Sequence, residues 1–412
     1  MNDSGVKIEV HLIQNFAPSN LNRDDTGQPK SATFGCFRRA RISSQSSKRS
    51  VRREDPMSRL LEQGGAWRTR QLILEIARAI DEKDEPAQKT VDTVADVFEA
   101  GGLERREKGS EPKKTTKILV FLDKGALPEI TKVFKDKWAD LTKGKKETKE
   151  AARDEVGRLL FEAVKAPDIA LFGRMLEVKN NTPFGKYNMR VDAACQVAHP
   201  ISTHKVDMEM DFYTAVDDLN PEEETGAGMM GVVGFNSACY YRYALVDRDQ
   251  LARNLARKTE RKNGKWAQEL VANDYEAADS VIKAFLEAMV YAIPTGKQNS
   301  FAAQNLPSFG LFVRRQGGVP ISLANAFAKP VRPTKDDDDL LGLSVDRLTK
   351  HWDALKQVYG EQGVQTTAYF HVEQEPHLMR KDDGGKDHQW LSDSDKKSVD
   401  EAINAVMEEK KS

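Results

Sequence analysis

Paired carboxylates are the first residues of this chain whose type and spacing could support catalysis. Asp24 and Asp25 lie together in a polar segment beside a cationic stretch, where a carboxylate could activate a nucleophile near a phosphate. No second carboxylate or histidine stands close by in the sequence to complete such a site. We therefore favour a structural interpretation, in which the two aspartates pair with Arg23 or shape the loop.

Histidines and cysteines are the residues that could bind a metal. His199 and His204 are five residues apart in an expected strand, and this odd spacing sends their side chains to opposite faces. The segment 371–377 holds two more histidines and two glutamates, which could meet at a metal only after a bend, so a surface loop is favoured. The three cysteines show no C-x-x-C spacing. We expect no metal site and no disulfide framework.

A glycine-rich segment fits the dinucleotide-binding pattern G-x-G-x-x-G. It reads GAGMMG and contains Gly226, Gly228 and Gly231. A true fingerprint follows an apolar strand and opens a helix, whereas PEEET precedes this segment and GVVGFNS follows it. Walker A, H-E-x-x-H and G-x-S-x-G motifs are also missing. We expect no cofactor, no catalytic residues and no enzymatic activity.

Composition places weak limits on the function. The 412 residues have a formal net charge of −1, so binding to a polyanion would depend on local segregation of charge. No stretch approaches the ~18 apolar residues of a membrane helix, and the start MNDSGVKIEV has no apolar signal core. These features predict a cytoplasmic protein without a membrane partner.

The elements that must position these residues alternate between sheet and helix. Residues 6–13 show the period of a strand with one buried face, and 18–35 is rich in turn formers and predicts an exposed loop. A short strand follows at 37–42, and Ser43 or Ser44 can cap the next helix. Residues 56–166 have helical periodicity and predict a helical subdomain inserted into a sheet domain.

The second half of the chain returns to strands and helices. Residues 191–204 predict a strand, and 204–236 predict a long β-hairpin that projects from the body. Helices are expected at 247–258 and 267–292, strands at 309–314 and 365–372, and a polar helix from about 393. The tract 329–342 is interpreted as a linker or surface loop.

Charge is segregated most strongly in the stretch RRARISSQSSKRSVRR, residues 38–53. Between Asp25 and Glu54 the sequence contains eight lysines and arginines and no acid. Cations at this density repel one another unless a polyanion offsets them, and arginine suits phosphate oxygens. The serines and Gln45 add uncharged hydrogen-bonding groups. This pattern favours sequence-independent gripping of a nucleic-acid backbone over a merely solvated basic helix.

The predicted hairpin carries an apolar stripe that is a second candidate contact. Met208, Met210, Phe212 and Tyr213 could wedge between bases or stack on them. The alternative is a stripe that packs on a neighbouring subunit. The two interpretations are compatible if the protein polymerises along a nucleic acid.

Several of these segments resemble one known family. SNLNRDDTGQPKSATFG followed by RRARISSQSSKR is similar to the start of CasC-type backbone subunits of the type I-E CRISPR Cascade surveillance complex. DIALFGRM at 168–175, AHPISTHKVDMEMDFYTAVDDL at 198–219, YYRYALVD at 240–247, and IPTGKQNSFAA with PISLANAFAKPV at 293–331 extend the resemblance. The region 104–166 and the acidic hairpin tip depart from the family's pattern.

The resemblance implies an α+β fold shaped like a hand. It implies an RRM-like (ferredoxin-like) antiparallel-sheet palm at 1–55, 167–203 and 237–412, inserted helical fingers at 56–166 and a projecting β-hairpin thumb at 204–236. Several copies would line up along one CRISPR RNA. Other implied partners are further Cascade subunits, the target DNA strand paired to the guide and a recruited helicase-nuclease.

The resemblance also implies which residues meet the RNA. The guide-backbone contacts would be Asn22, Arg23, Lys30, Arg39, Arg41, Ser43, Gln45, Ser46, Lys48, Arg49 and Arg52. Arg174 and Met175 would lie against the RNA near a kink, and Phe212 and Tyr213 would take the aromatic positions of the thumb.

The expected function is therefore a non-catalytic RNA-binding subunit that polymerises along a guide and presents it for pairing with invading DNA in antiviral defence. The alternative is a guide-bound RNA endonuclease, like the related backbone subunits of type III complexes, that uses Asp24 or Asp25. A third hypothesis is a general nucleic-acid chaperone without a fixed assembly.

Overall fold

The chain divides into two compact units. The computed structural model describes residues 5–105, 115–215, 229–262, 265–335, 339–372, 378–381 and 387–408. Unit 1 comprises Met1–Met57, Gln196–Asp247 and Ile282–Ser412, and unit 2 comprises Ser58–Cys195 and Arg248–Val281. Each unit is therefore assembled from segments that lie far apart in the sequence.

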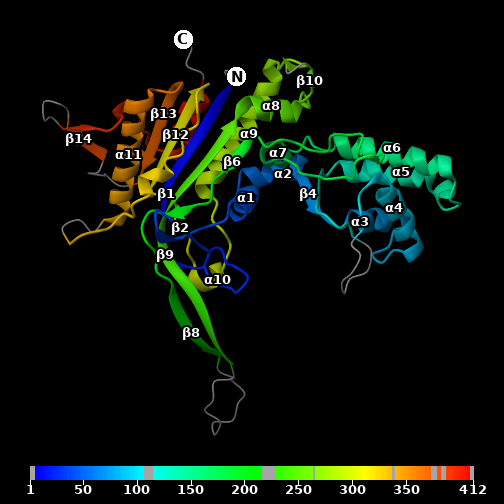
Figure 1. Ribbon diagram of the computed structural model, residues 1–412, viewed down its shortest axis with the longest axis horizontal. Coiled ribbons are helices and arrows are strands. Elements are labelled where there is room, and N and C mark those ends of the chain that lie inside the picture. Colours follow the sequence, from blue (N-terminus) through cyan, green and yellow to red (C-terminus); the bar gives the residue numbers. More distant parts are fainter. Residues whose placement is uncertain are drawn as a thin grey trace, which may run out of the picture. The chain divides into compact units, whose positions relative to one another are not determined.

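An antiparallel sheet forms the centre of unit 1 (Figure 1). Its strands are ordered β13-β12-β1-β9-β6, and β7 and β8 also pair with β9. The central strand β1 pairs antiparallel with β9 on one side and with β12 on the other. The bounds are β1 Val6–Ser19, β6 Cys195–Val197, β7 Ile201–Ser202, β8 Glu209–Ala215, β9 Met229–Asp247, β12 Phe309–Gln316 and β13 Val364–His371. Together with the helices, this sheet confirms the predicted α+β class with an antiparallel sheet.

Strand β1 is buried on both faces, so the prediction of one buried face is wrong. Its polar residues Glu9 and His11 are as inaccessible as the apolar residues between them. Helices from distant parts of the chain cover the sheet. Helix α11 (Leu340–Tyr359) packs on β1, α12 (Val399–Met407) packs on β12 and β13, and α9 (Ala272–Tyr291) accepts a hydrogen bond from Arg242, which pairs with Leu12. Alternation along a strand identifies its two faces but not whether a later helix covers the polar one.

The buried polar groups of β1 fasten a loop to the sheet. Glu9 ion-pairs with Arg315 at 3.0 Å and accepts a hydrogen bond from the Ile321 backbone N–H at 2.6 Å. Burial raises the pKa of Glu9 and lowers that of His11 to about 3, so His11 is neutral and bonds to Tyr241 at 2.8 Å. Buried polar groups are expensive unless they are paired, and here the pairing orders the segment that leads to the short helix η1 (Ala324–Phe327).

Smaller elements of unit 1 surround the sheet. β2 (Ser31–Phe34) and β3 (Phe37–Ala40) form a hairpin, where the sequence predicted a loop up to residue 35. Helix α1 (Ser44–Arg53) starts at the predicted cap, because the Ser43 side chain accepts a hydrogen bond from the Ser46 backbone N–H. The remaining bounds are α10 Gln298–Phe301, β14 Met379–Lys381, β15 Asp387–Gln389 and η3 Ser392–Ser394.

Strands β8 and β9 extend beyond the sheet as a two-stranded ribbon (Figure 1). The pairing runs from Glu209 opposite Phe235 to Ala215 opposite Met229. The predicted hairpin is thus present, although 205–208 is not in a strand. Residues 216–228, which include the first half of the GAGMMG segment, lie outside the described residues.

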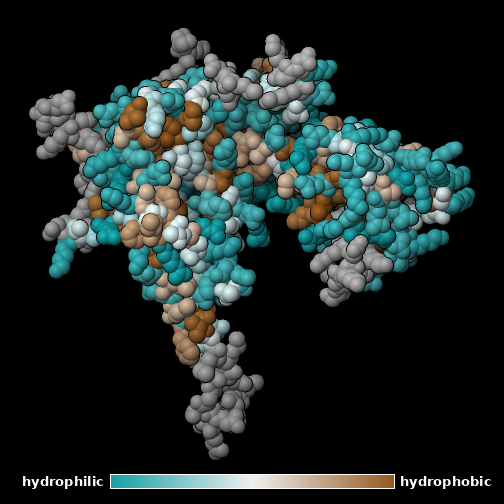
Figure 2. Space-filling model, viewed as in Figure 1, coloured by the Kyte–Doolittle hydropathy of each residue, from teal (hydrophilic) through white to brown (hydrophobic). Residues whose placement is uncertain are grey.

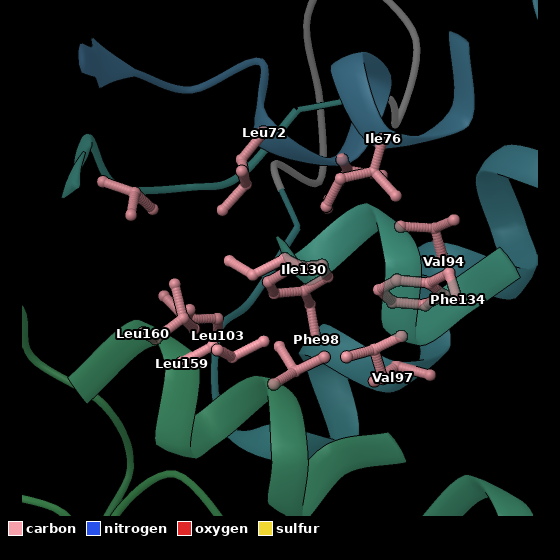
Figure 3. Packing of buried hydrophobic residues seen from close by; sticks show 14 of the residues in the cluster. Leu72, Ile76, Val94, Val97, Phe98, Leu103, Ile130, Phe134, Leu159 and Leu160 are labelled. Carbon is pink, nitrogen blue, oxygen red and sulfur yellow. The ribbon is translucent and has the colours of Figure 1, made fainter. Parts of the chain in front are cut away.

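Unit 2 is mainly helical and has a hydrophobic core. Side chains from α3, α4, α5 and α6 point toward one another, among them Phe98, Ile130, Phe134 and Leu160 (Figure 3). The bounds are α2 Met57–Gly64, β4 Ala66–Thr69, α3 Leu72–Asp81, α4 Gln88–Gly101, β5 Val120–Asp123, α5 Ala126–Leu141, α6 Lys146–Glu162, α7 Pro167–Phe172, α8 Arg248–Ala256, β10 Arg261–Lys262, β11 Lys265–Trp266 and α9 Ala272–Tyr291. Helix α9 crosses from unit 2 into unit 1. Among the described residues, no helix combines the length and the apolar character that crossing a membrane requires.

Candidate nucleic-acid interface

We call the cationic stretch the strip and define it as residues 30 and 38–53; all of its cations except Arg39 are at least partly exposed. It runs from β3 through the Ser43 cap into α1. On α1, Ser47 and Val51 face the interior, whereas Arg49 and Arg53 are exposed and Lys48 and Arg52 are half-buried. The 3.6-residue period therefore turns Ser47 and Val51 inward and leaves the arginines toward solvent.

Asn22 holds the two ends of the strip together. Its side-chain oxygen accepts a hydrogen bond from the Ser43 backbone N–H at 2.8 Å, and its backbone carbonyl accepts one from Lys30 at 2.9 Å. The Arg41 N–H in turn donates to the Lys30 carbonyl at 2.9 Å. Four of the predicted contact positions, Asn22, Lys30, Arg41 and Ser43, are thus brought to one junction.

His199 supports the same junction. Its Nδ1 atom accepts hydrogen bonds from the Arg41 guanidinium and from the Ser44 backbone N–H, both at 3.1 Å. His199 therefore ties the side chain of Arg41 to the N-terminus of α1. No group of three or more metal-binding side chains occurs in the described parts of the chain.

A polar cavity of about 790 Å³ opens beside α1 and lies within unit 1. Cations line it from two segments: Arg23 comes from the loop after β1, and Arg49 and Arg53 come from α1. The other lining residues are Leu21, Asn22, Asp24, Ser46, Ser50, Glu54, Ile293, Thr295 and Gly296. The structure thus brings together four residues from the predicted contact set, Asn22, Arg23, Ser46 and Arg49.

The cavity also contains residues that we did not include in the predicted contact set. Ser50 and Arg53 lie one helical turn beyond Ser46 and Arg49, so helical periodicity alone could have found them. Thr295 and Gly296 come from a segment about 250 residues further along the chain. A Cβ added at Gly296 would lie 2.2 Å from the Leu21 carbonyl oxygen, which requires glycine at this close approach.

Asp24 is used within its own loop. Its Oδ1 atom accepts hydrogen bonds from the Thr26 hydroxyl at 2.8 Å and from the Gln28 backbone N–H at 2.9 Å. These bonds lower the pKa of Asp24, most strongly through Thr26. The loop-shaping interpretation of Asp24 is consistent with this geometry, whereas Asp25 is exposed.

Two arginines of the predicted contact set are buried. Arg39 is fully inaccessible, and its guanidinium donates to backbone carbonyls in unit 1. Arg174 is 3% exposed and donates to the carbonyls of Met189 and Leu160 in unit 2, both at 2.9 Å, and burial lowers its pKa to about 9. The neighbouring Met175 is 79% exposed. The presence of an arginine in the sequence does not show whether its guanidinium is buried among backbone carbonyls or exposed to solvent.

The ribbon has one apolar face and one face on which two acids and Tyr213 lie. Met210, Phe212 and Val232 are 56%, 62% and 56% exposed, and Phe212 lies opposite Val232. The strand period places Glu209 and Asp211 on the other face, and both are exposed. Apolar residues are visible along the ribbon in Figure 2.

The predicted wedge residues are therefore not equivalent. Met208 is half-buried, and it lies near the ribbon's base, where a Cβ at Gly234 would lie 3.2 Å from its sulfur. Tyr213 is 40% exposed, and its ring packs on Gly231 across the ribbon. Met210 and Phe212 are the most available of the four for contact with another molecule.

Comparison with known proteins agrees with this architecture. The sequence profile of the CT1975-like protein family matches residues 8–393. The chain belongs to the CT1975-like family. No curated protein sequence matches it.

Chains of similar fold occur in solved structures of RNA-guided complexes. A chain of a "CRISPR RNA-guided surveillance complex, pre-nicking" is 28% identical, with a TM-score of 0.75, and the match covers 97% of this chain and 99% of that one. A chain of a second "CRISPR RNA-guided surveillance complex" is 22% identical, with a TM-score of 0.67 and the same coverage, and supports the fold alone. This member of the CT1975-like family thus matches, over nearly its whole length, a chain found in an RNA-guided complex.

Proposed function

We propose that this chain is a CRISPR RNA-binding backbone subunit of a Cascade-type complex, of the type I-E kind, and that several copies line up along one guide. The observation that carries the proposal is the full-length likeness to a chain of an RNA-guided surveillance complex at 28% identity. The strip and the ribbon are the two surfaces of unit 1 that fit such a role.

The strip supports the gripping of RNA backbone. Exposed Arg49 and Arg53 and the cavity beside them offer guanidinium and hydroxyl groups, which bind phosphate and ribose without reading base identity. The Ser43-capped N-terminus of α1 adds a favourable dipole for anions. Recognition of this kind tolerates any guide sequence, and target choice is left to base pairing.

The ribbon supports a role at the bases. Exposed Met210 and Phe212 on one face can insert between or stack on bases, and the acids of the opposite face are repelled by phosphate. In this proposal the ribbon is the thumb, the sheet of unit 1 is an RRM-like palm and the helices of unit 2 include the fingers. The proposed partners are the guide, the target DNA strand, copies of this chain, other Cascade subunits and a recruited helicase-nuclease in the cytoplasm.

The proposed subunit is non-catalytic. Asp24 already accepts hydrogen bonds from its own loop, which supports a structural role for this carboxylate. We expect Asp25→Ala in a reconstituted complex to leave cleavage of a guide-complementary RNA unchanged. The measurement is gel analysis of the labelled target RNA, and cleavage that the substitution abolishes would favour the endonuclease alternative.

The assembly itself is the most informative test. The full-length chain is co-expressed with a CRISPR transcript and its companion subunits, and the purified complex is analysed by native mass spectrometry and RNA sequencing. We expect short RNA of uniform length with several copies of this chain. A preparation that carries RNA of random length and sequence would instead favour a general chaperone, and one without RNA would overturn the proposal.

A further inference from the structure

Arg39 differs from the other cations of the strip because its guanidinium is fully buried. It is 0% exposed, although it is flanked by the exposed Arg38 and the half-buried Arg41. Its Nη1 atom donates to the carbonyls of Ser202 and Thr203 at 2.9 and 3.0 Å. We call these contacts, together with those of Nη2 described next, the Arg39 clamp.

The second terminal nitrogen binds a different segment. Nη2 donates to the carbonyls of Phe327 and Ala328 at 2.7 and 3.3 Å. A guanidinium carries four terminal N–H groups, and the clamp uses all four, while the remaining Nε is itself buried. No N–H group of Arg39 is therefore left at the surface for a phosphate.

Other contacts tie the same three segments together. The Ala40 N–H donates to the Ser202 hydroxyl at 3.1 Å, and the Val206 N–H donates to the Arg38 carbonyl at 3.1 Å. The β2–β3 turn lies directly against the third segment, since a Cβ at Gly35 would come within 1.7 Å of the Ala328 oxygen. The hairpin is thus fixed at its turn and along β3.

The position of the clamp in the chain joins the two candidate RNA surfaces. Arg39 lies four residues before Ser43, the cap of α1, and Thr203 lies six residues before Glu209, the start of the ribbon. A planar guanidinium can span two chain segments in a fixed geometry, whereas the ammonium of lysine is a single point with three donors. Only arginine can hold both segments at once.

We propose that Arg39 is a positioning residue, which fixes the spacing between the strip and the base of the ribbon and makes no phosphate contact of its own. This inference rests on the proposed function. It assigns to Arg39 a different role from Arg49 and Arg53, whose side chains line the open cavity. If this inference is right, a positive charge at position 39 is not enough for RNA binding, and the guanidinium itself is required.

Conservative and charge-removing substitutions separate the two roles. We expect Arg39→Lys and Arg39→Gln to lose RNA affinity equally, by about ten-fold or more, because both leave buried carbonyls without their donors. If Arg39 contacted phosphate, lysine would retain most of the affinity. Arg158→Lys on α6 is the matched control at an exposed position outside the strip and the ribbon, and it should bind as the wild type does.

The measurement is fluorescence anisotropy with a labelled single-stranded RNA of mixed sequence and the full-length chain. Circular dichroism at the assay temperature establishes that each variant is folded. The fluorescence of a 2-aminopurine base in the RNA reports whether the ribbon still displaces bases. If Arg39 only stabilised the fold, this fluorescence change would be the same in the folded variant as in the wild type. We expect this signal to fall in Arg39→Lys along with the affinity.

Ser202→Ala tests the attachment of β3 beside the clamp without touching any cation, should the Arg39 variants fail to fold. It removes two hydrogen bonds of the Ser202 hydroxyl, one accepted from the Ala40 N–H and one donated to the His204 carbonyl, and should lower RNA affinity about three-fold or more. Wild-type affinity in folded Arg39→Lys or, if that variant is unfolded, in Ser202→Ala would overturn this inference alone. A wild-type protein without RNA affinity would overturn the proposed function and this inference with it.

Discussion

The strip and the ribbon belong to the same unit but are built in opposite ways. The strip is polar, and its backbone is anchored at Asn22, at His199 and through the Arg39 clamp. The ribbon is a pair of strands whose apolar side chains Met210 and Phe212 are more than half exposed. A two-stranded ribbon gains little stability of its own, so its exposed apolar face implies contact with something else.

The difference teaches how one chain can hold a nucleic acid without reading its sequence. A rigid polar surface suits the regular phosphate backbone, where small errors in position cost several contacts at once. A slender apolar projection suits bases, because every base has a stacking face. The two surfaces should therefore respond differently to salt, to charge removal and to loss of apolar area.

The largest effect is expected from the strip. Arg49→Ala with Arg53→Ala should lower RNA affinity by about a hundred-fold at moderate salt, and the slope of log K against log salt should shrink by about 1.4, since each single-strand phosphate contact contributes about 0.7. Anisotropy titrations over a salt series measure both. Lys350→Ala with Lys356→Ala on α11 removes the same charge elsewhere, and an equal loss in that control would contradict a local contact.

The ribbon should show a smaller loss without a change in salt dependence. Met210→Ser with Phe212→Ser should weaken RNA binding by about ten-fold, within the range measured for base stacking. The salt slope should stay at its wild-type value, and the 2-aminopurine signal should disappear. Thr214→Ala on the same strand is the control. A reduced slope in the double variant would show that the ribbon also contacts phosphates.

Acidification should weaken the scaffold of the strip. Burial, and secondarily the charge of Arg39, lower the pKa of His204 from 6.5 to about 4, so the folded state keeps this imidazole neutral. The unfolded chain binds the proton from pH 6.5 downward, and stability therefore falls as pH decreases from 6.5 to 4. Between pH 7 and 5.5 His204 should account for about 1 kcal/mol of the loss in unfolding free energy.

The contribution of His204 can be isolated by difference. Urea unfolding of wild type and His204→Gln at the two pH values should show a smaller decrease in the variant, while the neutral His11, with a pKa of about 3, contributes equally to both. His371→Gln serves as the control that leaves both imidazoles in place. An identical pH dependence in all three proteins would exclude His204 as a source of the loss.

The smallest effect is expected from the acids of the ribbon. Glu209→Gln with Asp211→Asn removes two exposed acids and should raise RNA affinity about two-fold at low salt and not at high salt, as screened repulsion requires. Asp393→Asn with Asp400→Asn makes the same change in charge on another exposed part of unit 1. Weaker binding of the ribbon variant would mean that these acids contact a cationic partner.

Local sequence signals predicted the elements that carry the site. The strand at 6–13, the cap at Ser43 and the hairpin predicted at 204–236 appear in the structure, and the paired part of the hairpin runs from 209 to 235. Helix α11 was not predicted, since the acidic tract before it suggested a linker. In fact Asp339 of that tract caps the helix and accepts hydrogen bonds from Leu341 and Gly342.

Local sequence signals did not predict which charged side chains are buried and which are exposed. Arg39 and Arg49 are chemically identical in the sequence, yet the first is buried among carbonyls of residues 202–203 and 327–328 and the second lines an open cavity. Glu9 and His11 have the spacing of a solvated strand face and are buried beneath α11. These outcomes depend on contacts between residues more than a hundred positions apart.

The sequence by itself determined the class of surface: a stretch free of acids and rich in arginine and serine, a capped basic helix and an apolar hairpin. Charge density and periodicity are local properties, and they survive in any fold that exposes the segment. The tertiary structure alone decided which cations are exposed to solvent and which are buried and bonded to backbone carbonyls. A guanidinium loses its hydration only when separate chain segments pack around it. The free energy that offsets this desolvation comes from folding of the whole sheet and its covering helices.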